Sequence, residues 1–202
     1  MFNFIGTRNR KKLTLIEISE LWLKSKKFSV KLSTYCNYKQ KLEDYIYPQL
    51  GSLKYSEISQ TQLNDFIDYL LVSGKKDGNG GLSKGTVKDI ITLMKSISKF
   101  AHTEYNLKNI CVNLNISKNE IQILSGSERK KLETYLLSNL NLPNLCILLC
   151  LYTGLRVGEI CGLKWENIDI KNGCLFVNRT VERISLENGK TMIVIEPPKT
   201  ES

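Results

Sequence analysis

The segment TGLRVGEICGLKWENID occupies residues 153–169. Gly154 permits a sharp break in the backbone, and Arg156 is predicted to lie in the first turn of a short helix that runs through residues 157–163. A guanidinium and free N–H groups at such a place suit an anion such as phosphate. Glu159 follows three residues later on the same helix face, where it can orient Arg156. An ordinary surface helix also carries ion pairs of this spacing, so the residues alone leave both interpretations open.

The residues that follow this segment predict a β-hairpin. Asn172-Gly173 and Asn188-Gly189 are strong turn signals, and they flank strand candidates at residues 174–184 and 191–195. Pro197-Pro198 ends the second candidate, because proline cannot donate a hydrogen bond to a strand ladder. We therefore expect a small antiparallel element in this part of the chain.

The residues that precede the segment predict helices. One is expected from Ser125 or Ser127 through Leu137, and the next from Pro143 to Thr153. Apolar residues at helical spacing predict four more in the first half of the chain. The first begins after the N-cap Thr14, which has Glu17 at capping-box spacing. The other three begin at Ser33, near Thr61 and after the N-cap Ser83.

For two of these four helices the sequence also predicts an end or a buried face. The helix from Ser33 is expected to reach about Tyr47 and to stop at Pro48 and Gly51, because proline lacks the N–H that a helix interior needs. The last helix presents an apolar stripe that should face a core. Its members are Val87, Ile90, Ile91, Met94, Ile97 and Phe100.

The helical period is lost between residues 108 and 124, where Asn, Ser and Lys predominate, and this predicts a linker. The expected organisation is a basic N-terminal segment (1–12), a helical domain (13–107), the linker (108–124) and a second domain (125–202). The sequence therefore predicts a mainly α protein with a small β-hairpin.

The charge of the chain is concentrated in its first half. All 202 residues carry 29 basic and 20 acidic side chains, a formal net charge of +9. Residues 1–107 hold 17 of the basic and 10 of the acidic ones, so this half carries +7. The helical domain is the candidate binder of a polyanion. The longest apolar run, residues 145–152, is too short to cross a bilayer, and no export signal is evident, so a cytoplasmic protein is expected.

The cysteine and histidine pattern does not predict a metal site or a hydrolase. No CxxC occurs, and Cys146 and Cys150 lie four residues apart in an apolar stretch, so we interpret them as small core hydrophobes. His102 is the single histidine and is interpreted as a helix-end or packing residue. The glycine-rich loop at residues 74–81 has no Walker ending and no preceding strand, which indicates a helix connection.

TGLRVGE followed by CGLKWENIDI resembles the motif around the first catalytic arginine of the tyrosine recombinases, the phage-integrase family. The resemblance extends over nearly the whole chain. STYCNYKQKLEDYIYPQLG and GLSKGTVKDIITLMKSISKFAHTEYNL resemble two helices of the family's core-binding domain, ILSGSERKKLETYL resembles the opening of its catalytic domain, and PPKT resembles its catalytic-lysine segment. KNICVN at residues 108–113 departs from the family pattern, in which many members have Asn-Pro, and this leaves the domain boundary open.

The resemblance implies a SAM-like helical core-binding domain followed by the N-terminal part of an α+β catalytic domain. It also implies a mechanism: a tyrosine attacks a DNA phosphodiester and forms a 3′-phosphotyrosyl link without metal, ATP or another cofactor. By motif match, Arg156 would hold the scissile phosphate, Glu159 would support the site, and Lys199 would be the general acid for the leaving 5′-oxygen. Double-stranded DNA is the implied partner, and the full enzyme is implied to act as a tetramer on it.

Other parts of the family's machinery are missing from the 202 residues. No His-x-x-Arg occurs, and no tyrosine stands beyond the place of a second arginine. The chain is therefore expected to be truncated within the catalytic domain, to bind DNA, and to be inactive in strand cleavage by itself. The DNA contacts expected near the starts of the second and fourth helices are Ser33, Lys39, Ser83, Lys84 and Lys88.

Two alternatives remain open on the sequence. One is a non-catalytic DNA-binding regulator that uses the helical domain only, with Arg156 and Glu159 as a structural ion pair. The other is a helical protein-interaction module whose positive charge only keeps it soluble. Binding to DNA would exclude the protein-interaction module, because the recombinase and the regulator are both expected to bind DNA.

Overall fold

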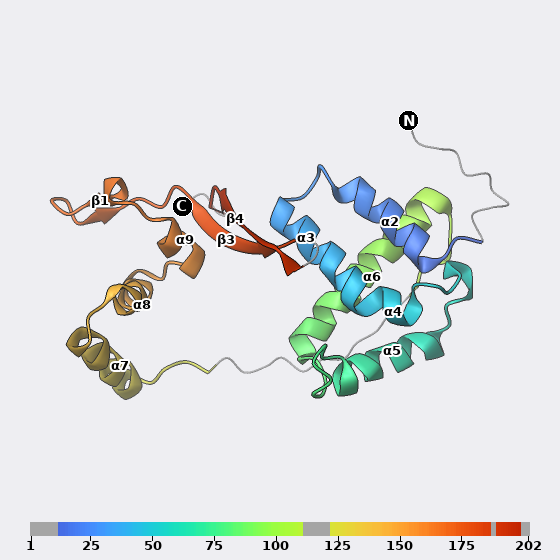
Figure 1. Cartoon of the computed structure of the whole chain (residues 1–202), viewed down its shortest axis with the longest axis horizontal. Helices are drawn as coiled ribbons and strands as arrows, with labels where there is room; N and C mark the ends of the chain where they lie inside the picture. Colours follow the sequence, from blue (N-terminus) through green and yellow to red (C-terminus); the bar gives the residue numbers. More distant parts are fainter. Residues whose placement is uncertain (1–11, 111–121, 187–188, 199–202) are drawn as a thin grey trace. The chain divides into compact units, whose positions relative to one another are not determined.

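The computed structural model describes residues 12–110, 122–186 and 189–198. The chain divides into two compact units, residues 1–118 and 119–202, and the division falls outside the described residues. Figure 1 follows the chain from blue at the N-terminus to red at the C-terminus. The described elements are mostly helices, with two small antiparallel sheets, which confirms the predicted fold class.

The first unit is helical. Its elements are α2 (Leu15–Lys26), α3 (Leu32–Lys41), the π-helical segment η1 (Leu42–Ile46), α4 (Tyr47–Leu50), the 3₁₀ turn η2 (Tyr55–Glu57), α5 (Gln60–Ser73) and α6 (Lys84–Tyr105). Thr14 and Glu17 form the predicted capping box, and Ser83 caps α6 as predicted. The N-cap of α5 is Ser59, whose capping box with Gln62 starts this helix before Thr61.

The helical run expected to stop at Pro48 and Gly51 passes Pro48 and ends at Leu50, with Gly51 as its C-cap. The five residues of η1 form a π-helical segment, and Pro48 then lies in the first turn of α4, which runs to Leu50. The fixed φ of proline suits the first turn of a helix, so Pro48 is tolerated at this position of α4. The change of helical register in η1 thus accommodates the proline inside a continuous helical run.

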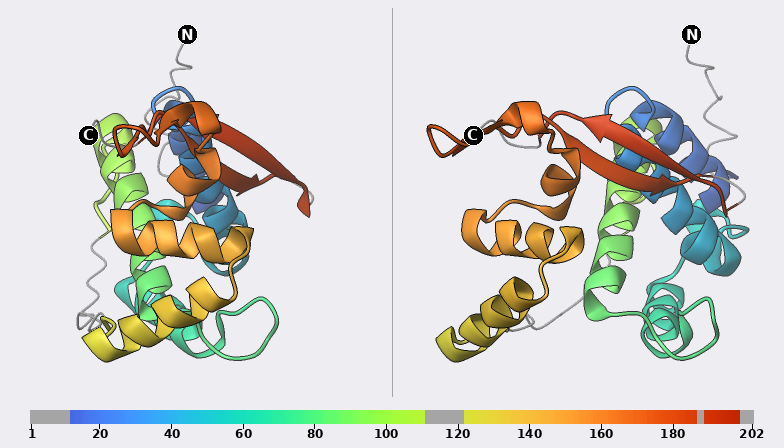
Figure 2. Two further views of the ribbon diagram at one scale, coloured as in Figure 1. Left: turned by 90° about the vertical axis from the view of Figure 1, so that its left-hand side faces the viewer. Right: turned by 60° about the vertical axis from the view of Figure 1, so that its left-hand side comes forward.

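The core of the first unit forms around α6. The predicted stripe on α6 is buried at every position except Phe100, which is half-buried and packs against the same core. Trp22 of α2, Leu42 of η1 and Leu70 of α5 are fully buried against this cluster. The views in Figure 2 show α6 as the longest helix of this unit, with the other helices around it.

The second unit combines helices with two hairpins. Its elements are α7 (Gly126–Ser138), α8 (Leu142–Thr153), α9 (Val157–Gly162), the 3₁₀ turn η3 (Trp165–Asn167), β1 (Ile168–Asp169), β2 (Cys174–Leu175), β3 (Thr180–Ser185) and β4 (Thr191–Glu196). Ser125 is the N-cap of α7. β1 pairs with β2 and β3 pairs with β4, both antiparallel, with Thr180 opposite Glu196 and Ser185 opposite Thr191.

The strand expected at residues 174–184 is two strands, which corrects the prediction. Among the described residues, β2 pairs only with β1 and β3 only with β4, and residues 176–179 between them belong to neither ladder. Asp169 accepts hydrogen bonds from the backbone N–H and the side chain of Asn172, at 3.0 and 2.7 Å, which closes the β1–β2 turn. The run from 174 to 184 is divided because its two halves pair with different partners.

The second unit buries far fewer apolar side chains than the first. Among the described residues, its buried apolar side chains are Leu136, Leu148, Ile160 and Ile184. Cys146 and Cys150 are only half-buried, so the prediction that they belong to a core is not met. On α8, which carries no charged residue, Leu142 and Tyr152 are 74% and 62% exposed. Nowhere in the described part of the chain is a helix both long and apolar enough to span a membrane.

Candidate functional site

The site predicted at Arg156 lies at the junction of α8 and α9. α8 ends at Gly154, which has a φ of +71° and whose N–H donates to the carbonyl of Cys150. This left-handed conformation favours glycine and turns the chain between the two helices. Arg156 is the N-cap of α9, in extended conformation, and not a residue of the first turn as predicted. Its carbonyl accepts from the N–H groups of Glu159 and Ile160 at 2.9 and 3.0 Å.

Glu159 binds Arg156 through both carboxylate oxygens. Oε2 accepts from the backbone N–H of Arg156 at 2.8 Å, and Oε1 accepts from Nη1 at 3.0 Å. The backbone hydrogen bond and then the guanidinium lower the pKa of Glu159. The Glu159 side chain is 9% exposed, whereas that of Arg156 is 65% exposed. The carboxylate therefore anchors the arginine and leaves most of its donors accessible.

A hollow of about 330 Å³ lies beside this pair. Arg156 and Glu159 line it from α9, and residues 180–183 line it from β3. The residues that line it all belong to the second unit. An exposed guanidinium at the edge of a hollow is suited to bind an anionic oxygen.

Two glycines of α9 bring the helix against β3. A Cβ atom at Gly158 would lie 2.6 Å from Oγ1 of Thr180 and 3.0 Å from the carbonyl oxygen of Val181. A Cβ atom at Gly162 would lie 2.8 Å from the carbonyl oxygen of Arg179. The i, i+4 spacing places both glycines on one face of the helix. Sequence reasoning missed this role, although two glycines four residues apart in a six-residue helix were a usable signal.

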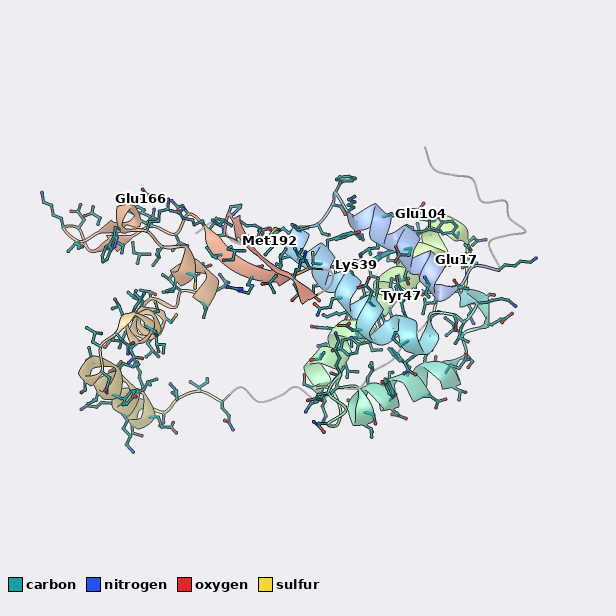
Figure 3. All side chains as sticks on the ribbon, in the orientation of Figure 1. Glu17, Lys39, Tyr47, Glu104, Glu166 and Met192 are labelled. Carbon is teal, nitrogen blue, oxygen red and sulfur yellow. The ribbon has the colours of Figure 1, made fainter. Side chains whose placement is uncertain are left out.

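Arg179 is a second residue that the sequence did not single out. Its Nη2 lies 3.4 Å from Oε1 of Glu166, and Lys164 approaches the same carboxylate at 3.6 Å. Glu166 lies in η3, where Figure 3 labels it. Nε of Arg179 is buried without a hydrogen-bond partner among the described residues. Arg179 therefore lies between Glu166 and the face of α9 that carries Gly162.

The candidate DNA-binding residues at the start of α6 differ in how accessible their polar groups are to DNA. The hydroxyl oxygen of Ser83 accepts from the N–H of Thr86 at 3.1 Å, so this hydroxyl serves as the helix cap. Lys84 and Lys88 are exposed one turn apart on the same helix. The two lysines thus present their ammonium groups to solvent at the start of α6.

The candidate DNA-binding residues of α3 are placed less favourably for contact with DNA. Ser33 is half-buried in the first turn. Lys39 lies near the C-terminal end of α3, which corrects its expected place near the start, and Figure 3 labels it there. Its Nζ is 3.7 Å from Oε1 of Glu43. Lys199 falls outside the described residues, and the structure therefore says nothing of its place.

In the part of the chain that the structure describes, neither His102 nor the acidic residues form a metal site. Nδ1 of His102 is 3.0 Å from the carbonyl oxygen of Leu107, which confirms its helix-end role. No three His, Cys, Asp or Glu side chains come together as metal ligands within residues 12–110, 122–186 and 189–198.

Known proteins are similar to this chain in sequence. Residues 14–71 match the family model of the phage integrase N-terminal SAM-like domain, and residues 115–195 match that of the phage integrase family. A protein of Caldanaerobacter subterraneus subsp. tengcongensis described as "Tyrosine recombinase XerC-like" is 29% identical over 206 aligned positions, which cover 94% of this chain and 50% of the relative. The chain thus spans about half the length of this curated relative.

Solved structures show the same fold. The integrase of transposon Tn1549, solved in complex with a circular intermediate DNA, superposes with a TM-score of 0.71 and 17% identity, over 93% of this chain and 58% of that one. The lambda integrase, solved as a tetramer bound to a Holliday junction, gives 0.60 and 19%, over 96% of this chain and 55% of that one. The family itself rests on the two matching family models and the curated relative: the chain belongs to the phage integrase family of tyrosine recombinases.

Proposed function

We propose that this chain is the DNA-binding portion and part of the catalytic portion of a site-specific recombinase from a mobile element. The observation that carries the proposal is Arg156, anchored by Glu159 at an open hollow inside the region that matches the phage integrase family. The DNA-bound transposon and phage integrases of similar fold support a mobile-element origin and double-stranded DNA as the partner. Such a substrate would place the protein in the cytoplasm.

The residues have distinct proposed roles. Arg156 holds two oxygens of the scissile phosphate through its planar fork, and Glu159 fixes the orientation of that fork. Lys199 protonates the leaving 5′-oxygen. The first unit holds the duplex through phosphate contacts, chiefly Lys84 and Lys88, with Ser33, Lys39 and Ser83 beside them. The 202 residues supply neither the second arginine nor the tyrosine nucleophile, and the complete enzyme is a tetramer on DNA.

Salt-dependent binding to duplex DNA tests the proposal. If about six phosphates are neutralised, the logarithm of the affinity should fall with the logarithm of the salt concentration with a slope of roughly −5. Lys84→Gln and Lys88→Gln should each reduce this slope by about 1. Lys54→Gln is the matched control, because Lys54 pairs with Glu57 at 2.8 Å in another part of the same unit. A wild-type slope near zero would refute DNA binding through phosphates.

A DNA-binding regulator is the second candidate function. It is favoured by one observation: nearly all buried apolar side chains lie in the first unit, which therefore has a core of its own. The two functions differ at Arg156. In a recombinase, Arg156→Gln reduces the salt slope because a phosphate contact is lost, whereas in a regulator that uses only the first unit this substitution leaves the slope unchanged.

A further inference from the structure

The turn between α2 and α3 carries the most exposed large apolar side chain among the described residues. Phe28 is 93% exposed, so its ring gains almost nothing from burial in the folded chain. Figure 1 shows the turn projecting beyond the ends of the two helices that it joins. A ring in this place is available to a partner.

Hydrogen bonds to one carbonyl close this turn. α2 ends at Lys26, whose carbonyl oxygen accepts from the backbone N–H groups of Ser29 and Val30 at 3.0 and 3.2 Å. The Ser29 hydroxyl donates to the same oxygen at 3.3 Å. Phe28 therefore lies at the tip of a short turn whose backbone is already fixed, which reduces the entropy that binding costs.

The residues around Phe28 are basic. Residues 21–42 contain six lysines and no acidic residue. Two of the six form ion pairs, Lys39 with Glu43 at 3.7 Å and Lys41 with Asp89 at 3.3 Å. The other four lie within four positions of the phenylalanine, and we call residues 24–31 the basic turn. These four lysines are Lys24, Lys26, Lys27 and Lys31.

Two lysines of the basic turn lie over aromatic rings. Nζ of Lys26 is 5.8 Å from the centre of the Trp22 ring, and Nζ of Lys27 is 5.8 Å from the centre of the Phe28 ring. Unlike an ion pair, such a contact does not neutralise the positive charge. The basic turn thus combines an exposed apolar ring with positive charge. Duplex DNA has the complementary structure, with phosphates outside and stacked bases inside.

We propose that the basic turn binds duplex DNA, with its lysines on phosphates and Phe28 inserted between two neighbouring base pairs from the minor groove. The inference rests on the proposed function and deepens it, because it adds a contact to the bases in a unit whose other expected contacts are to phosphates. The turn leads directly into α3, whose second residue, Ser33, is one of those expected contacts.

Insertion of Phe28 would also contribute to the choice of DNA site. An apolar side chain that enters between base pairs partly unstacks the step and bends the duplex. The cost of this deformation depends on the sequence and is low at flexible pyrimidine–purine steps such as TA. Phe28 would therefore favour sites with such a step where the basic turn meets the groove.

An anionic membrane is the other partner that attracts lysines and aromatic rings. A helix that lies in a membrane interface presents a continuous apolar face to the lipid. α2 instead buries its apolar residues in the core, and α3 has six polar or charged residues among its ten. These observations favour DNA, and vesicles therefore serve as a competing partner in the test.

The test measures binding of the 202-residue chain to a fluorescently labelled duplex by anisotropy, with 2-aminopurine in its TA steps to report unstacking. Phe28→Ala should weaken binding roughly fivefold or more, because aromatic contacts to bases are lost, and should abolish the rise in 2-aminopurine fluorescence. It should leave the salt slope unchanged, because no phosphate contact is removed. Lys27→Gln should instead reduce the slope by about 1 and retain the fluorescence rise.

Two further variants serve as controls. Phe28→Met should retain most of the affinity and the fluorescence rise, because methionine can also enter between base pairs. Val72→Ala removes another exposed apolar side chain of the same unit and should change neither signal. Val72 is 69% exposed on α5, which contains two aspartates and no basic residue. Phe28→Ala should unfold in urea at the wild-type midpoint, because the ring is exposed.

The outcomes separate this inference from the proposed function. Wild-type affinity of Phe28→Ala, with salt-dependent binding intact, overturns the insertion and leaves DNA binding standing. The same holds if the wild type binds duplex DNA without a rise in 2-aminopurine fluorescence. If Phe28→Ala loses binding to vesicles of phosphatidylserine and phosphatidylcholine but not to DNA, the basic turn is a membrane contact and the inference is overturned. A wild-type chain without a salt-dependent affinity for DNA overturns the proposed function and this inference together.

Discussion

Gly158 of α9 lies against Thr180 of β3 so closely that a Cβ atom at the glycine would stand 2.6 Å from the threonine hydroxyl oxygen. The carbonyl oxygen of Val181, at 3.0 Å from the same point, is backbone and cannot rotate away. A methyl group therefore requires α9 to move from β3. Since Arg156 is the N-cap of that helix, this movement would displace the arginine as well.

Gly158→Ala should destabilise the second unit by about 1–3 kcal/mol, the usual cost of inserting a methyl group into a tight contact. Hydrogen exchange should show faster exchange in peptides of α9 and β3 and no change in α5 and α6. Gly126→Ala is the matched control, because Gly126 begins α7 and nothing lies within 4 Å of its added Cβ. Unchanged exchange in α9 of the Gly158 variant would show that β3 tolerates a side chain there.

The stability of α9 should depend on pH through Glu159. The hydrogen bonds from Arg156 lower the pKa of Glu159 below its ordinary 4.5. A lowered folded-state pKa means that the stabilisation is complete above pH 4.5 and is lost as the pH falls through the folded-state value. Protection of α9 amides should therefore decline in acid in the wild type and should be less pH-dependent in Glu159→Gln.

Glu128→Gln provides the comparison for this experiment. The Ser125 hydroxyl and then its backbone N–H lower the pKa of Glu128, within the capping box of α7. Its substitution should flatten the acid response of α7 amides and leave that of α9 intact. Equal flattening in both helices by either variant would refute the assignment of the α9 response to Glu159.

An alkaline response is expected in the first unit. The Tyr47 hydroxyl donates to Oε1 of Glu20 at 2.9 Å, and burial followed by this hydrogen bond raises the pKa of Tyr47. The unfolded chain ionises this tyrosine near pH 10 and the folded chain does not, so stability falls as the pH rises above 10. Tyr47→Phe should cost about 1.5–3 kcal/mol at neutral pH. It should also weaken the alkaline loss of stability, measured by urea unfolding. Tyr69→Phe, at a 40% exposed position, is the control.

The sequence predicted the elements whose signals are local. Thr14 with Glu17 and Ser83 are caps, and the α6 stripe follows one helical face, so a few neighbouring residues suffice to specify them. The single strand predicted at residues 174–184 was wrong because its two halves pair with different neighbours: β2 pairs with β1, which precedes it, and β3 pairs with β4, which follows it. The passage through Pro48 was missed because a π-helical segment has no simple residue signal.

The candidate site likewise has one part that local spacing predicts and another that depends on the tertiary fold. The Arg156–Glu159 pair follows from three-residue spacing and was predicted from the sequence. The hollow beside this pair could not be found in this way, because only the folding of β3 beside α9 brings residues 156–159 and 180–183 together. The glycines of α9 can be read from the sequence, but their role in helix–strand packing depends on the position of Thr180, which only the structure gives.

Arg156→Lys should separate binding from chemistry. Lysine keeps the charge, so the salt slope for duplex DNA should equal that of the wild type. In a recombinase completed with the half that this chain does not span, the same substitution should reduce cleavage at least a hundredfold, because lysine lacks the fork that holds two phosphate oxygens. Cleavage at the wild-type rate would reduce Arg156 to a structural partner of Glu159.

The 202-residue chain should form no covalent adduct with DNA. Seven of its nine tyrosines belong to the first unit, where Tyr55 is fully buried and the Tyr47 hydroxyl is bound to Glu20. The other two, Tyr135 and Tyr152, are exposed on α7 and α8, and the guanidinium carbon of Arg129 lies 5.8 Å from the centre of the Tyr152 ring. None of the nine lines the hollow beside Arg156.

Catalytic groups that act as a unit do not retain activity in proportion to their number, so one arginine without its nucleophile should leave no detectable cleavage. The assay uses a nicked suicide duplex and a denaturing gel, on which a phosphotyrosyl adduct migrates slowly until protease digests it. Tyr135→Phe and Tyr152→Phe identify the source of any band. An adduct that disappears in one of these variants would show that α7 or α8 supplies a nucleophile and that the chain can cleave DNA by itself.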